Sequence, residues 1–150
     1  MATDYATILG RVRLQLMDSG AGVWADADLL GAIRLSLQDL NLRAGVEYTV
    51  TDLDGATATT LPSNLEGVLS IGSTAYALKS RFVQRSESFE LVNQSGDIKA
   101  LAEMYYSGFE ALAAKVFTAE QARTASQKAA SSSIFGSWAD DWGEVGKWEH

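Results

Sequence analysis

The sequence predicts a mainly α-helical fold: a four-helix bundle-like domain with a short β-hairpin between the second and third helices, followed by a C-terminal docking arm. Four stretches repeat apolar residues every three or four positions, which is the period of one helical face. Between the second and third stretches, Asp54-Gly55 lies between β-branched segments, a pattern typical of a hairpin. The last seventeen residues hold three of the four tryptophans and three glycines.

The first two helices are predicted from their caps and apolar stripes. Thr3 or Asp4 stands where an N-cap belongs before the first stripe, and Asp26 stands there before the second. Gly45 follows the second stripe and is expected to end that helix. The two stripes are Tyr5, Ile8, Leu9, Val12 and Leu16, and Leu29, Leu30, Ile33, Leu37 and Leu40.

The third helix carries the strongest periodic pattern of the chain, and a fourth follows it. Ser63 with Glu66 three residues later forms a capping box that opens the third helix. We expect a loop at 93–96, Asp97 as the next cap, and a fourth helix that ends near Ala130. The apolar seam of the third helix is Leu61, Val68, Ile71, Ala75, Leu78, Phe82 and Phe89. The expected core face of the fourth is Ile98, Leu101, Tyr105, Phe109, Leu112 and Val116.

Residues 1–130 are predicted to form the helical domain and residues 131–150 a flexible, Trp-rich arm that begins at a serine hinge. Interior glycines cost about 1 kcal/mol each in a helix, so this segment needs a surface to fold against. That surface is either its own domain or another subunit, where Trp is a favoured anchor. The predicted anchors are Ile134, Phe135, Trp138, Trp142, Val145 and Trp148.

Composition narrows the classes of function. With 12 basic and 19 acidic residues, the net charge of -7 argues against a protein that grips nucleic acid through its phosphates. The chain has no cysteine, which excludes disulfides and thiolate metal sites. No apolar stretch approaches the about 20 residues of a membrane span, and the N-terminus lacks a leader pattern. We expect a soluble, unprocessed protein made in the cytoplasm.

Residues with catalytic chemistry are few, so we predict no catalytic, cofactor-binding or metal-binding residue and no enzymatic activity. The only histidine is His150. The pairs of neighbouring acids are Asp26 and Asp28, Asp52 and Asp54, and Asp140 and Asp141. Each pair has a simpler explanation as a helix start, a turn or part of the arm. An enzyme would require Asp26 and Asp28 to share a pocket with a further acid.

One compact basic group stands out on the third helix, where Arg81 and Arg85 lie one turn apart beside Lys79. Such a group either neutralises a phosphate or forms salt bridges. The candidate partners are another subunit, Glu66, Glu87 and Glu90. Tyr105 and Tyr106 are adjacent, so only one of them can face the core.

The order of these parts, with the segments Trp24–Leu30 and Leu61–Leu65, resembles the head-to-tail connector proteins of tailed bacteriophages, also called adaptor or head-completion proteins. Members of that family often show a W-x-D-x-[DE]-L-L opening to the second helix and an L-P-x-x-L entry to the third. This chain has WADADLL and LPSNL at those places. The resemblance covers about residues 5 to 120, and the tail matches in kind only.

The resemblance implies a virion protein of the neck that assembles in the host cytoplasm into a ring, usually a dodecamer. Its C-terminal segment docks on the portal protein, its other face receives tail proteins, and DNA passes through without sequence-specific binding. Ring closure requires one face of a subunit to meet a different face of the next. We assign Arg81, Arg85 and the exposed one of Tyr105 and Tyr106 to that contact. The alternative is a monomeric or dimeric helical binding module whose Trp-rich tail grips a single protein partner.

Overall fold

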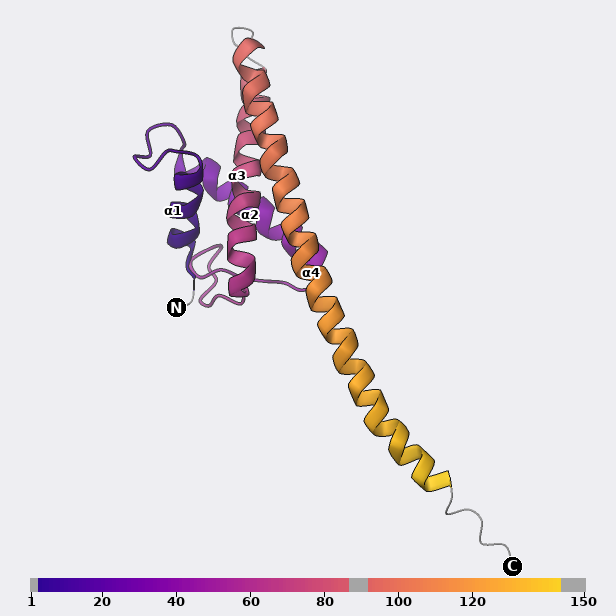
Figure 1. Cartoon of the computed structure of the whole chain (residues 1–150). Helices are drawn as coiled ribbons and strands as arrows, with labels where there is room; N and C mark the ends of the chain where they lie inside the picture. The colour runs from indigo at the N-terminus through magenta and orange to yellow at the C-terminus, as the bar shows by residue number, and fades with distance from the viewer. Residues whose placement is uncertain (1–2, 87–91, 144–150) are drawn as a thin grey trace, which may run out of the picture. The chain divides into compact units, whose positions relative to one another are not determined.

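The computed structural model describes residues 3–86 and 92–143 and is mainly helical, which confirms that part of the predicted fold class (Figure 1). Its helices are α1 (Tyr5–Gln15), α2 (Asp26–Ala44), α3 (Ser63–Ser86) and α4 (Val92–Gly143). The chain divides into two compact units, Met1–Ala114 and Lys115–His150. Within the described ranges, no helix combines the length and apolar character that crossing a membrane requires.

Two predicted caps are confirmed. Asp4 is the N-cap of α1, and its carboxylate accepts a hydrogen bond from the backbone N–H of Thr7 at 2.8 Å. Gly45 ends α2 in the left-handed conformation with φ of 66°, and its N–H donates to the carbonyl of Asn41 at 2.9 Å. Both ends follow from local chemistry, since each cap satisfies backbone groups that the helix leaves unpaired.

Two other caps differ from the prediction by one residue. Asp26 is the first helical residue of α2 rather than its N-cap, and its carboxylate pairs with Arg13. Ser63 is likewise the first residue of α3, so the predicted capping box does not form in that register. Glu66 instead accepts a hydrogen bond from the Thr3 hydroxyl, which ties the start of α3 to the segment before α1.

Helix α3 forms the centre of the first unit and packs against both α1 and α2 (Figure 1). Small polar side chains lie in this core because their hydroxyls bond to the helix itself: Ser73 donates to the Leu69 carbonyl at 2.7 Å. Gly72 permits the closest approach, since a Cβ there would lie 2.6 Å from Cδ2 of Phe109. The buried residues of α3 are Leu65, Val68, Leu69, Ser70, Gly72, Ser73, Thr74, Ala75, Ala77 and Leu78.

The predicted β-hairpin is wrong, because the described segment between α2 and α3 forms only a single-residue bridge, from Thr51 to the N-cap of α1. Two backbone N–H groups that would donate to carbonyls in a strand pair donate to threonine hydroxyls instead. The N–H of Thr49 donates to Oγ1 of Thr60, and the N–H of Thr51 to Oγ1 of Thr59, both at 2.8 Å. The two arms are also joined by backbone bonds, such as that from the N–H of Thr60 to the carbonyl of Thr49 at 3.0 Å, but these do not repeat as a ladder.

Helix α4 begins at Val92, so the predicted loop at 93–96 and the cap at Asp97 are wrong. A single interior glycine in that segment costs only about 1 kcal/mol, which a helix with strong formers downstream can absorb. The helix also continues past Ala130 and through the serines at 131–133. Those serines were expected to be a hinge, and their backbone is helical.

The predicted core face of α4 is right only at Phe109, which is fully buried. Leu101 and Leu112 are 41% and 38% exposed, whereas the alanines one residue further along, Ala102 and Ala113, are buried. One residue is a rotation of about 100° around a helix. The apolar arc of α4 is wider than one contact face, and its side with small residues packs inward. Leu101 and Leu112 consequently stay exposed, while Phe109 packs inward.

Candidate functional site

The loop between α1 and α2 is built around the buried carboxylate of Asp18. It accepts hydrogen bonds from the backbone N–H groups of residues 22–24, each at 3.0 Å, and from Nη1 of Arg13 at 2.9 Å. The other end of the Arg13 guanidinium donates to the Trp24 carbonyl at 3.2 Å and pairs with Asp26. One arginine and one aspartate thus fix the path of the whole loop.

Burial by itself disfavours the charged form of Asp18 and acts to raise its pKa. The three backbone donors and Arg13 outweigh that effect, so the pKa of Asp18 lies below its ordinary value of 3.8. The carboxylate is therefore ionised at neutral pH, and its negative charge is what gathers the N–H groups of the loop.

This fixed loop presents apolar side chains to solvent. Met17 is 95% exposed and has φ of 54°, the left-handed region that a non-glycine residue seldom adopts. Leu14 in the last turn of α1 and Val23 in the same loop are 72% and 60% exposed. We call these three residues, Leu14, Met17 and Val23, the α1 knob.

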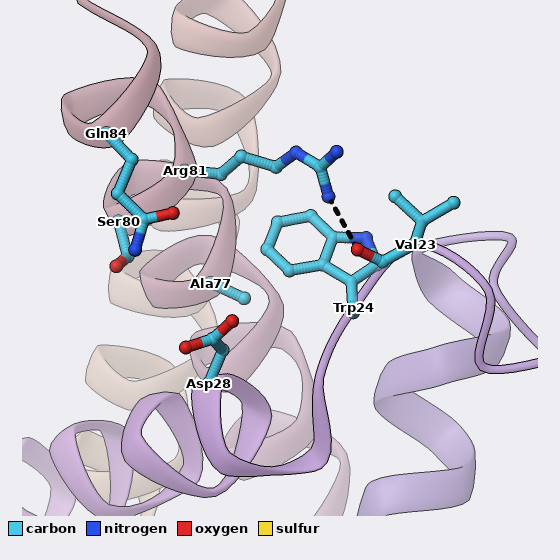
Figure 2. A pocket seen from close by; sticks show the side chains of 7 residues that line it. All are labelled: Val23, Trp24, Asp28, Ala77, Ser80, Arg81 and Gln84. Carbon is cyan, nitrogen blue, oxygen red and sulfur yellow. Dashed lines mark hydrogen bonds between the residues drawn. The ribbon is translucent and has the colours of Figure 1, made fainter. Parts of the chain in front are cut away.

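Trp24 and Arg81 form one wall of a hollow of about 280 Å³ beside the knob (Figure 2). The guanidinium carbon of Arg81 lies 4.7 Å from the centre of a Trp24 ring, and its Nη1 donates to the Val23 carbonyl at 3.1 Å. Asp28 faces α3 from the start of α2 (Figure 2). We call this the Trp24 hollow, lined by Val23, Trp24, Asp28, Ala77, Ser80, Arg81 and Gln84.

The structure thus places Arg81 against a loop of its own chain, a contact that the sequence did not indicate. The stacking over Trp24 is a cation–π contact, worth about 0.5–1 kcal/mol at an exposed site. The predicted neighbour Arg85 has a side chain outside those that the structure describes.

A second hollow, of about 310 Å³, lies between α3 and α4. Buried Ala75 and Ala102 contribute to its apolar lining. Lys79 and Lys99 are exposed, and Lys99 pairs with Glu103 at 3.9 Å. We call this the α3–α4 hollow, lined by Ala75, Lys79, Phe82, Lys99, Ala102, Glu103, Tyr106 and Ser107.

Of the two adjacent tyrosines, Tyr106 is the one that packs within the domain. Its ring meets Tyr76 edge-on at 6.0 Å between centroids and lies 6.1 Å from Phe109. The hydroxyl of Tyr76 donates to Asp39 at 3.0 Å, and burial followed by this bond raises the pKa of Tyr76. Tyr105 is half-buried, as Tyr106 is, and its role in a subunit contact stays a prediction.

Tyr105 shares a face of α4 with large exposed side chains. Residues 101, 104, 105 and 112 recur at helical spacing, and Met104 is 61% exposed. A helix face of this kind is normally covered. We call it the α4 outer face, made of Leu101, Met104, Tyr105 and Leu112.

The predicted docking arm falls mainly outside what the structure describes. Val145 and Trp148 lie beyond the described residues. The backbone at Ile134, Phe135, Trp138 and Trp142 belongs to α4, but their side chains are not among those described. Their role as docking anchors stays a prediction.

The acids singled out from the sequence have local roles. Asp26 and Asp28 lie exposed in the first turn of α2, and Asp28 is the only acid that lines the Trp24 hollow. The described part of the chain holds no group of three or more acidic or histidine side chains that could bind a metal ion.

Comparison of the chain with protein-family models, with curated proteins and with solved structures finds no match. The resemblance to connectors therefore depends on the two short segments alone. In the structure both segments are anchors of the fold: Trp24, Leu29, Leu61 and Leu65 are all buried.

Proposed function

We propose that this chain is a structural subunit of the neck of a tailed bacteriophage. It forms a ring that joins the capsid portal to the tail and leaves a central passage for DNA. The observation that carries the proposal is the exposure of large apolar side chains on two separate parts of the first unit. These are the α1 knob and the α4 outer face.

Exposed apolar surface of this extent is typical of an interaction site. Burial stabilises by about 25 cal/mol per Å² of apolar surface removed from water, so each face gains from a partner. Two different faces on one subunit suit a heterologous contact, in which each copy meets the next. Such contacts close into a ring when the rotation between copies permits it.

The charge of the chain agrees with a passage for DNA. A net charge of -7 repels phosphates, so DNA moving past the ring would not adhere to it. The arm, with its three tryptophans, supplies the anchors for docking on the portal. Forming the ring, binding the portal and binding the tail are all structural roles.

The portal contact is tested by mixing the full chain with a candidate portal protein and measuring the mass of the mixture by light scattering behind a sizing column. The matched variant lacks residues 136–150 and keeps the first unit, Met1–Ala114, intact. We expect the full chain to elute with the portal and the truncated chain to elute alone with unchanged melting. Loss of thermal stability on truncation would instead place the tryptophans in the core, and binding of both chains would contradict docking through the arm.

A further inference from the structure

The two hollows lie on opposite sides of α3. Ala77, Arg81 and Gln84 follow one another at helical spacing and line the Trp24 hollow. Ala75, Lys79 and Phe82 line the α3–α4 hollow. At about 100° per residue, the two rows are centred roughly half a turn apart. The α1 knob, whose Val23 borders the first hollow, therefore lies across α3 from the second.

The knob and the α3–α4 hollow both offer apolar side chains. One is a projection of exposed apolar side chains, and the other is a cavity of about 310 Å³ that includes Phe82 and Tyr106. A flexible thioether such as that of Met17 packs favourably against aromatic rings. The knob cannot fill the α3–α4 hollow of its own subunit, because α3 separates the two surfaces.

Charges beside the two surfaces are also complementary. Asp28 lines the same hollow as Val23, and Lys79 lines the α3–α4 hollow. Among the described side chains, neither Asp28 nor Lys79 has an oppositely charged group within 4.0 Å. Within the described residues, Asp28 therefore lies outside the ion pairs at the first hollow, which Arg81 also lines. Lys79 lies outside them at the second hollow, where Glu103 pairs with Lys99.

The knob is held in place before any contact forms. The bonds of Asp18 to residues 22–24 and to Arg13 fix the loop, and Met17 keeps its left-handed backbone with its side chain in solvent. A conformation of this kind persists only where its surroundings determine it, and it is common at binding sites. A preformed projection binds without the cost of ordering a loop.

We propose that the α3–α4 hollow of one copy receives the α1 knob of the next copy. Met17 then inserts beside Phe82 and Tyr106, and Asp28 faces Lys79. The inference rests on the proposed ring and names the α1 knob and the α3–α4 hollow as the surfaces that join its subunits, which leaves the α4 outer face for another contact. Because the two surfaces lie on opposite sides of α3, the contact runs head to tail.

Cysteine crosslinking tests this contact in the full chain, which contains no native cysteine. The test variant combines Met17→Cys on the knob with Ser107→Cys at the hollow, treated with a short bis-maleimide. The matched control combines Leu42→Cys, an 84% exposed residue outside both surfaces, with Ser107→Cys. We expect a ladder of covalent multimers from the test variant and monomers from the control. Mixing the two single variants, Met17→Cys and Ser107→Cys, should yield crosslinked dimers only.

A charge swap tests the same contact independently. Lys79→Glu should weaken subunit association about tenfold, since it replaces an attraction with a repulsion. Adding Asp28→Lys to the same chain should restore association. A merely destabilised domain would not be rescued by the second change.

The outcomes separate this contact from the ring itself. A ring that gives no ladder and no charge rescue would overturn the knob-and-hollow contact and leave the proposed function standing. Crosslinking of Met17→Cys to itself would overturn the contact as well, because it indicates two equal faces. A protein that stays monomeric at every concentration would overturn both.

Discussion

The buried carboxylate of Asp18 holds the loop that carries part of the exposed α1 knob. Its bonds to residues 22–24 and to Arg13 place Met17 and Val23 in solvent and set Trp24 beneath Arg81. None of these contacts is visible as a periodic pattern, since they depend on a loop that folds back on one side chain. The two side chains that fix the loop, Arg13 and Asp18, are therefore not among the exposed side chains of the knob.

The lowered pKa of Asp18 predicts an effect of pH on stability. Its contribution is fully present above the ordinary pKa of 3.8 and is lost as the pH falls through the lower pKa of the folded state. Asp18→Asn should therefore melt several degrees below the wild type at pH 7, and the difference should shrink at pH 3. Circular dichroism melts at both values measure it. Equal melting temperatures at pH 7, or a gap that persists in acid, would contradict this role.

At the scale of the elements, the sequence predicted what is set locally. Helix periods and the caps at Asp4 and Gly45 depend on neighbouring residues, so they could be predicted without tertiary information. The predicted hairpin does not form a ladder because the hydroxyls of Thr59 and Thr60 accept hydrogen bonds from the backbone N–H groups of Thr51 and Thr49. The β-branched residues correctly indicated two extended segments. They could not show which acceptor each backbone N–H bonds to.

The candidate site was predicted in part for a similar reason. Arg81 was singled out for its charge, but its contact with Trp24 links segments far apart in the sequence. The apolar arc of α4 was recognised, yet its periodicity could not show that Ala102 faces inward and Leu101 outward. Small residues of α3, such as Gly72, determine which side of α4 can pack closely against α3. This packing leaves the α4 outer face exposed and available to a partner.

The crossing of α2, α3 and α4 depends on Gly72. A Cβ there would meet Ser36 and the ring of Phe109, so Gly72→Ala should destabilise the domain by about 1–3 kcal/mol through overpacking. Gly67 in the same helix has open space around it, so Gly67→Ala should stabilise by about 1 kcal/mol through helix propensity. Urea unfolding of both variants measures the two effects. Changes of the same sign would argue against a tight crossing at Gly72.

At the scale of the whole molecule, the first unit is a folded domain with apolar surface left over. Its core is closed around α3, while the α1 knob and the α4 outer face remain in solvent. A domain with a closed core and several exposed apolar regions is suited to assemble with copies of itself through unlike faces. In the proposed ring, the net charge of -7 would keep DNA from adhering to the passage.

The central claim, that copies of this chain join through unlike faces into a closed ring, is tested most directly by counting the subunits. Native mass spectrometry of the full chain over a range of concentrations gives that count. We expect one discrete multimer, or a monomer that forms that multimer only when a portal protein is added. A monomer or dimer that ignores the portal, or a distribution that lengthens without limit as concentration rises, would contradict the ring.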